Sequence, residues 1–102
     1  GIYENLERII PSGMSALINC PNFTIPDRFV WLKELANIKT KEMLKTFNCG
    51  IGLVIIIHHK NKKAVQNFFK KNKINSHVIG EVVSKKSVGK VIIKNFGKWD
   101  LI

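Results

Sequence analysis

The sequence is poor in three features that usually mark a class of protein. It has only two cysteines, Cys20 and Cys49, and they lack the Cys-x-x-Cys spacing of a metal knuckle. It has no apolar run near the roughly 20 residues that span a bilayer, and no basic-then-apolar signal segment. It has only two arginines, Arg8 and Arg28, although arginine is the side chain best suited to reading bases. These shortages predict no disulfide framework and no membrane span, and they favour reduced cysteines in a cytoplasmic protein.

Acidic residues are also scarce, so that the formal net charge is +10. From His58 to Lys98 there are eleven lysines and one acid, Glu81. This imbalance is compatible with a free-standing basic domain that binds RNA or another anion. Lysine, asparagine and isoleucine are enriched together, however, and an AT-rich genome produces that trio without any function. A steep fall of oligonucleotide affinity with salt would identify the nucleic-acid alternative.

The chain has 102 residues, 45% of them apolar, which is enough for one small domain with a packed core. Helical periodicity and turn residues predict helices over 3–10, 26–36, 40–47 and 61–72. β-branched runs predict strands over 15–19, 51–57, 76–83 and 90–96, with a turn at 85–89 before the last one. The sequence therefore predicts an α+β fold, an α/β sandwich in which helices pack on a mixed sheet.

Residues 51–57 are the clearest predicted strand, because the run is apolar throughout apart from Gly52. Such a run is typical of a strand that is covered on both faces. The order strand, helix, strand over 51–83 favours parallel pairing with a right-handed crossover.

The helical repeats predict which faces are buried. Thr40 is expected to cap its helix, with Glu42 in the first turn, and the lysines of 61–72 are expected to form a solvated face. The apolar positions expected in the core are Leu6, Ile9, Ile10, Phe29, Trp31, Leu32, Leu35 or Ala36, Ala64, Val65, Phe68 and Phe69.

The segment "TFNCGIGLVIII" (46–57) begins with two glycines, which are unusual at the start of a strand. Gly50 and Gly52 could serve a bulge or a tight entry turn. They could equally allow the backbone to approach a ligand closely, and Asn48 offers a donor and an acceptor at the same place. The residues alone do not decide between these two interpretations.

Histidine offers no strong site. His58 and His59 follow the predicted strand 51–57 and have no third ligand at a recognisable spacing, so we expect a turn rather than a metal pair. His77 is expected to be a half-buried packing residue.

Several blocks in order resemble the C-terminal domain of the aminoimidazole ribonucleotide synthetase family, also called phosphoribosylformylglycinamidine cyclo-ligase. The blocks are "GIYENLERIIP" (1–11), "FVWLKELAN" (29–37), "KEMLKTFNCGIGL" (41–53) and "SHVIGEV" (76–82). They cover residues 1 to about 83 with the family spacing. The chain departs from the family pattern at Glu7, Ala36 and Lys45.

The resemblance implies that residues 1–102 are one partial domain from the last third of a two-domain ligase of purine biosynthesis, truncated at its N-terminus. Residues 84–102 would be a C-terminal extension of unassigned role. The whole enzyme would close the imidazole ring of formylglycinamidine ribonucleotide with ATP and Mg²⁺, as a cytoplasmic homodimer. This piece alone would be inactive, and it would self-associate or need a partner to cover its apolar surface.

The resemblance also implies site residues, although it assigns no catalytic side chain and no metal ligand within this chain. Glycine amides at a helix start hold anions, which implies a phosphate-binding helix start. The residues implied there are Gly1, Glu4 and Asn5. The loop implied at the cleft between domains contains Thr46, Phe47, Asn48, Gly50 and Gly52.

Overall fold

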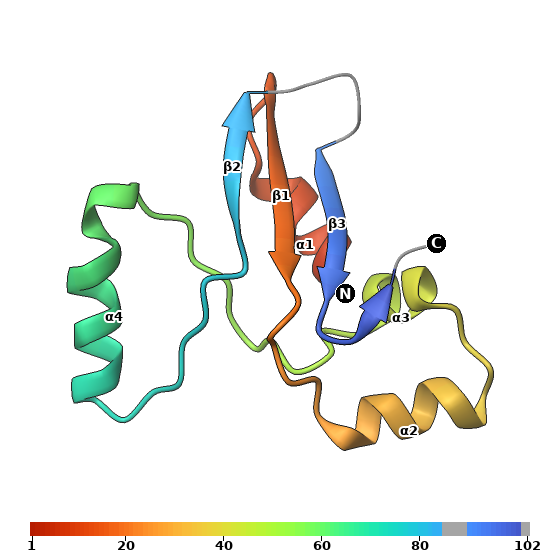
Figure 1. The fold of residues 1–102 in the computed structure, drawn as a ribbon. Coiled ribbons are helices and arrows are strands. Elements are labelled where there is room, and N and C mark those ends of the chain that lie inside the picture. The colour runs from red at the N-terminus through yellow and green to blue at the C-terminus, as the bar shows by residue number, and fades with distance from the viewer. Residues whose placement is uncertain (85–89, 101–102) are drawn as a thin grey trace.

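The computed structural model describes residues 1–84 and 90–100, and Figure 1 shows how their helices and strands are arranged. The elements, in chain order, are α1 (Ile2–Ile9), β1 (Met14–Cys20), α2 (Asp27–Leu35), α3 (Thr40–Thr46), the short 3-10 helix η1 (His59–Asn61), α4 (Lys62–Lys71), β2 (Gly80–Ser84), β3 (Val91–Phe96) and β4 (Trp99–Asp100). Helices are therefore confirmed in all four predicted places. None of the helices in the described ranges is long and apolar enough to cross a membrane.

The strands form one mixed sheet in the order β2-β1-β3-β4. β1 pairs antiparallel with β2 and parallel with β3, with Ala16 opposite Val91 and Ile18 opposite Ile93. The predicted α+β class and the strands 15–19 and 90–96 are confirmed. The strand predicted over 76–83 begins only at Gly80, and the turn predicted at 85–89 lies outside the described residues.

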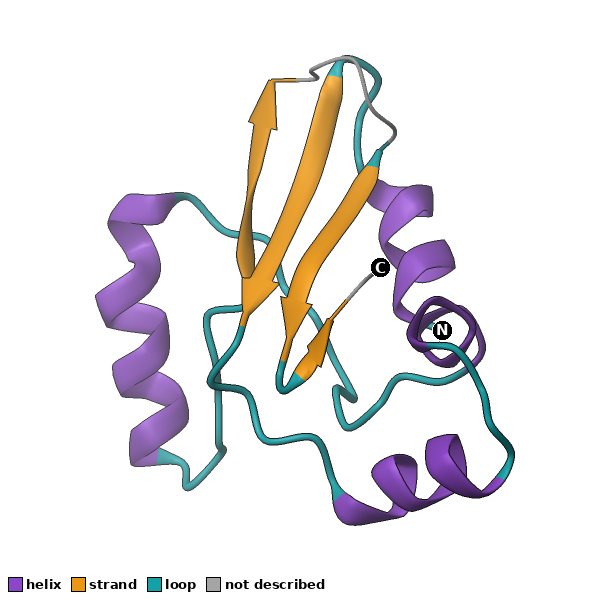
Figure 2. Cartoon of the chain, turned by 45° about the vertical axis from the view of Figure 1, so that its right-hand side comes forward, coloured by secondary structure: helices purple, strands orange, loops and turns teal. Residues whose placement is uncertain are grey.

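The core lies between the sheet and the helices on one of its faces. Along β1 the buried side chains alternate, so that Ala16, Ile18 and Cys20 point to the core. Figure 2 shows α1 and α3 on the same side of the sheet. The core cluster consists of Ile2, Leu6, Ile18, Cys20, Ile25, Met43, Leu44, Cys49, Ile93 and Phe96.

The prediction of a buried strand over 51–57 is wrong. The stretch is assigned to no strand, and Leu53 is 80% exposed. Apart from the Ile51 N–H, which bonds to Asn48 O, no backbone hydrogen bond joins these residues to the rest of the described chain. An apolar run becomes a strand only when another strand pairs with it, and β1 already has β2 and β3 on its two edges. The expected parallel crossover over 51–83 is therefore absent, and the parallel pair is β1 with β3.

The helix α4 also stands apart from the core. In Figures 1 and 2 it lies on the far side of β2 from the other helices. Phe68 is 61% exposed, Ala64 is exposed, and Val65 and Phe69 are only partly buried, so the prediction that this face is core is wrong. The lysines of α4 are all exposed, as predicted for a solvated face.

Other predicted core positions are also exposed. Ile9 is 55% exposed, Trp31 62% and Leu35 68%, because α2 buries none of its residues and α1 is only two turns long. Phe29 and Leu32 are partly buried and pack against the core, as expected.

Two further local expectations need correction. The N-cap of α3 is Lys39, so Thr40 is its first residue rather than its cap, although Glu42 does lie in the first turn. His77 is exposed rather than half-buried, although its ring meets Phe23 edge-on at a centroid distance of 5.3 Å.

Candidate functional site

The first segment predicted to bind phosphate is the start of α1. Gly1 caps this helix, and its carbonyl accepts hydrogen bonds from the Asn5 backbone N–H (3.3 Å) and side-chain Nδ2 (2.8 Å). Glu4 lies in the first turn with an exposed side chain, where a carboxylate favours the positive end of the helix dipole. The Asn5 side-chain amide therefore already has a partner at the helix start.

The second predicted segment is the loop that follows α3. Thr46 ends the helix with an exposed side chain, and Phe47 is partly buried with its ring 6.2 Å from that of Phe29. Asn48 Oδ1 accepts a hydrogen bond from the Gly50 N–H at 3.3 Å. This bond holds the loop in a tight turn and leaves the Asn48 amide nitrogen exposed, with no partner among residues 1–84 and 90–100.

Gly50 is required by its surroundings. Its φ is +103°, in the region that side-chain-bearing residues rarely adopt. A Cβ at this position would lie 2.5 Å from Pro26 Cδ and 3.5 Å from Phe23 Cζ. Pro26 and Phe23 thus fix the loop, and sequence reasoning missed both, because no periodicity links positions that lie more than twenty residues apart.

Cys49 anchors the loop in the core. Its side chain is fully buried, and Sγ lies 3.6 Å from the Met43 carbonyl and 3.8 Å from the Phe47 carbonyl. Burial raises the pKa of the Cys49 thiol to about 11. A buried, protonated thiol is a poor nucleophile. Cys20 is buried as well, and neither cysteine forms a disulfide.

Gly52 has different surroundings. A Cβ there would meet nothing within 4 Å, and its φ is not in the left-handed region. No contact within the described ranges therefore requires glycine at this position. Of the two interpretations of the glycines, the tight turn accounts for Gly50 but does not account for Gly52.

The structure brings the two predicted segments together. α1 packs against α3, and a Cβ on Gly1 would overlap the carbonyls of Leu44 and Lys45 in the last turn of α3. The start of α1 therefore lies against the end of α3, from which the loop continues. We name these two segments together the α1–α3 site; it contains Gly1, Glu4, Asn5, Thr46, Phe47, Asn48 and Gly50. Gly52 lies beyond it, at the start of the exposed stretch.

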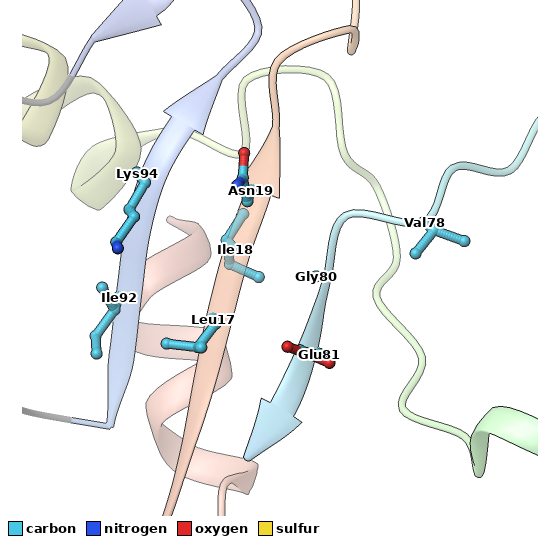
Figure 3. Close-up of a pocket in the computed structure, with 8 residues that line it drawn as sticks. All are labelled: Leu17, Ile18, Asn19, Val78, Gly80, Glu81, Ile92 and Lys94. Carbon is cyan, nitrogen blue, oxygen red and sulfur yellow. The ribbon is translucent and has the colours of Figure 1, made fainter. Parts of the chain in front are cut away.

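A separate open groove of about 370 Å³ lies on the face of the sheet that α1 does not cover (Figure 3). Leu17 and Ile92 contribute apolar side chains to its lining, and Glu81 and Lys94 contribute charged ones. None of the predicted site residues lines it. The groove holds no cluster of reactive side chains, so we place the candidate chemistry at the α1–α3 site.

The described residues contain no arrangement of histidines that would bind a metal ion. His58 caps η1 through Nδ1, which accepts from the Lys60 N–H at 3.3 Å, and its ring lies 4.4 Å from that of His59. This is the turn that the sequence predicts. In residues 1–84 and 90–100, no group of three or more His, Cys, Asp or Glu side chains could hold a metal ion.

Comparison with known proteins gives consistent matches. The family model "AIR synthase related protein, C-terminal domain" matches residues 1–93. The phosphoribosylformylglycinamidine cyclo-ligase of Neisseria gonorrhoeae is 41% identical over 68 residues, which is 67% of this chain and 20% of that protein. The enzyme of the same name from Lawsonia intracellularis is 36% identical over 89 residues (87% of this chain, 25% of that protein), and that of Staphylococcus aureus is 34% identical over 87 residues (85% and 25%). The chain thus spans a fifth to a quarter of the curated relatives that it matches.

Proposed function

Since the chain belongs to the AIR synthase related protein family, whose C-terminal domain it matches, we propose that it is the C-terminal part of a phosphoribosylformylglycinamidine cyclo-ligase. The whole enzyme would use ATP to close the imidazole ring of formylglycinamidine ribonucleotide, giving aminoimidazole ribonucleotide, ADP and phosphate. The observation that carries this proposal is the α1–α3 site, where two segments that resemble the family's ligand-contacting blocks lie side by side.

The residues of this site would bind and position rather than react. The N–H groups at the start of α1 would face an anion such as a phosphate, because a helix start presents unpaired donors. The exposed Asn48 amide would donate a hydrogen bond to the substrate or to a facing loop. Gly50 and Pro26 would keep that amide in place, since both fix the backbone of the turn.

The described residues alone do not fit a magnesium site, because they contain no cluster of carboxylates or other metal ligands. Glu4 is the acidic residue of the α1–α3 site, and it is exposed. Mg²⁺ and most of the ATP contacts would then belong to the polypeptide outside this chain. In that case residues 1–102 bind no metal by themselves and do not catalyse ring closure alone.

We place the whole protein in the cytoplasm as a homodimer whose interface lies outside this domain. Two buried free cysteines are compatible with a reducing compartment. The exposed apolar side chains of 53–57 and of α4 support the expectation that the isolated chain is covered by another polypeptide.

Two substitutions at Asn48 in the full-length enzyme test the proposal. Asn48→Asp keeps the oxygen that accepts from the Gly50 N–H but removes the exposed donor. Asn48→Ala removes both. If the amide contacts substrate, both variants lower kcat/KM for ring closure by roughly tenfold or more, as expected for one lost hydrogen bond to a charged or polar ligand.

Asn67→Ala is the matched control, because Asn67 is also exposed and lies on α4, outside the α1–α3 site. Its kcat/KM should equal that of the unmodified enzyme. Unchanged turnover and unchanged Michaelis constants in Asn48→Asp would show that Asn48 serves only its own loop.

A further inference from the structure

Residues 94–100 lie beyond the part of the chain that matches the family model, which ends at residue 93. They nevertheless belong to the fold. β3 continues through Phe96, the chain turns at Gly97, and β4 pairs antiparallel with β3, so that Trp99 lies opposite Phe96. Figure 2 shows β4 turned back beside the end of β3. We call residues 97–99 the Gly97 turn.

The Gly97 turn packs tightly against the connection between β1 and α2, residues 21–26. The Gly97 N–H donates a hydrogen bond to the carbonyl of Cys20, directly before the connection, at 3.0 Å. Gly97 has a φ of +60°, and a Cβ there would lie 2.8 Å from the Phe23 carbonyl oxygen and 2.8 Å from Ile25 Cδ1. Contacts this close leave no room for a side chain, so the turn and the connection pack as one unit.

The same connection holds the loop of the α1–α3 site. Pro26 Cδ lies 2.5 Å from the Cβ position of Gly50, and Phe23 Cζ lies 3.5 Å from it. The Phe23 ring also packs against the ring of Phe96, at a centroid distance of 5.3 Å. Phe23 therefore contacts both the strand that leads into the Gly97 turn and the loop that presents the Asn48 amide.

Trp99 gives this arrangement a second attachment. Its ring packs against the core, and Nζ of Lys33 in α2 lies 5.8 Å from the ring centroid, within the range of a cation–π contact. α2 has no fully buried residue, so partial contacts such as this one hold it. The helix begins at Asp27, directly after Pro26, and its placement therefore sets the position of that proline against Gly50.

We propose that the Gly97 turn is a positioning element of the α1–α3 site. Gly97 and Trp99 hold residues 21–26 and α2, and Pro26 in turn keeps the exposed Asn48 amide in the orientation that meets the substrate. Gly97 and Trp99 themselves do not touch the substrate. The effect of the turn on ring closure rests on the proposed function, in which the Asn48 amide donates to the substrate.

A double-mutant cycle in the full-length enzyme tests the proposal. Trp99→Ala removes the ring that Lys33 faces and should lower kcat/KM for ring closure by roughly threefold to tenfold, because a misplaced binding group loses part of its interaction. In the Asn48→Asp background the donor is already absent, so the same change should have little further effect. Trp99→Phe keeps an aromatic face for Lys33 and should restore most of the lost kcat/KM.

Two further variants separate this contact from the rest of the turn. Lys33→Ala removes the other partner of the contact and should give a smaller loss of the same kind. Lys98→Ala is the matched control, because Lys98 lies in the same turn with an exposed side chain. Its kcat/KM should equal that of the unmodified enzyme.

Hydrogen exchange in residues 1–102 gives a readout that does not depend on activity. The Gly50 N–H is bonded to Asn48 Oδ1 at 3.3 Å, so its exchange rate reports whether the loop keeps its turn. Trp99→Ala should raise that rate by about threefold or more, whereas the paired N–H groups of β1 should exchange as in the unmodified chain. Lys98→Ala should change neither rate.

An equal loss of kcat/KM from Trp99→Ala in both backgrounds would overturn the proposal, because Trp99 would then act on the fold as a whole. Unchanged exchange of the Gly50 N–H in Trp99→Ala would overturn it as well. If Asn48→Asp by itself leaves kcat/KM unchanged, the proposed role of Asn48 in binding substrate is wrong. The exchange of the Gly50 N–H then still decides whether the Gly97 turn holds the loop.

Discussion

Two regions of this chain have the same apolar composition and opposite surroundings. In the body, formed by residues 1–50, 80–84 and 90–100, Ile93 of β3 is 4% exposed. In the arm, formed by residues 52–75, Ile56 belongs to a run of equally apolar residues and is 48% exposed. The difference lies in the neighbouring strands. β3 has β1 beside it, whereas residues 52–57 have no strand beside them within residues 1–84 and 90–100. An apolar composition therefore indicates that a segment can form a strand, but the strand forms only where another strand is available to pair with it.

The largest expected contrast is between two phenylalanines. Phe96 is fully buried at the end of β3, and Phe96→Ala should lower the free energy of unfolding by about 3–5 kcal/mol. Phe68 is 61% exposed on α4, and Phe68→Ala should change it by less than about 0.5 kcal/mol. Urea unfolding followed by circular dichroism measures both variants. Equal losses would mean that α4 packs against the body.

A smaller contrast is expected between the two glycines of the loop. Gly50→Ala places a methyl group against Pro26 at a φ of +103°, and should cost about 2 kcal/mol. Gly52→Ala enters open space and should be neutral or slightly stabilising in this chain. The same urea experiment measures both variants. A large loss of unfolding free energy in Gly52→Ala would show that residues 52–57 are already packed.

These contrasts also explain which parts of the fold the sequence could predict. The helices and the strands 15–19 and 90–96 follow from local periodicity and from partners within the chain. The run 51–57 has the strongest strand pattern of all, but strand pairing is non-local, and no strand within the described ranges borders it. The predictions that Trp31 and Leu35 of α2 and the apolar face of α4 are buried were wrong for the same reason, since helical spacing identifies an apolar face but not what covers it.

In the candidate site, too, the sequence predicted the local features but not the contacts between distant segments. The blocks that resemble the ligase family indicated Gly1 and the loop at Asn48, and the structure places Gly1 against the last turn of α3, the helix that this loop follows. The contact between Gly50 and Pro26 depends on how α2 enters the body, which no local pattern specifies. Gly52 looked equivalent to Gly50 in the sequence, yet only Gly50 is constrained by its neighbours in the described structure.

Limited digestion of the chain with chymotrypsin tests the division into body and arm most directly. Proteases cut extended, unpaired backbone that can open locally at little cost. The first cut should follow Leu53, which is 80% exposed in the stretch 52–57. The bonds after Leu17 in β1 and after Phe96 in β3 should stay intact. Mass spectrometry of the early fragments identifies the sites. Early cleavage within β1 or β3, with the bond after Leu53 protected, would contradict the account.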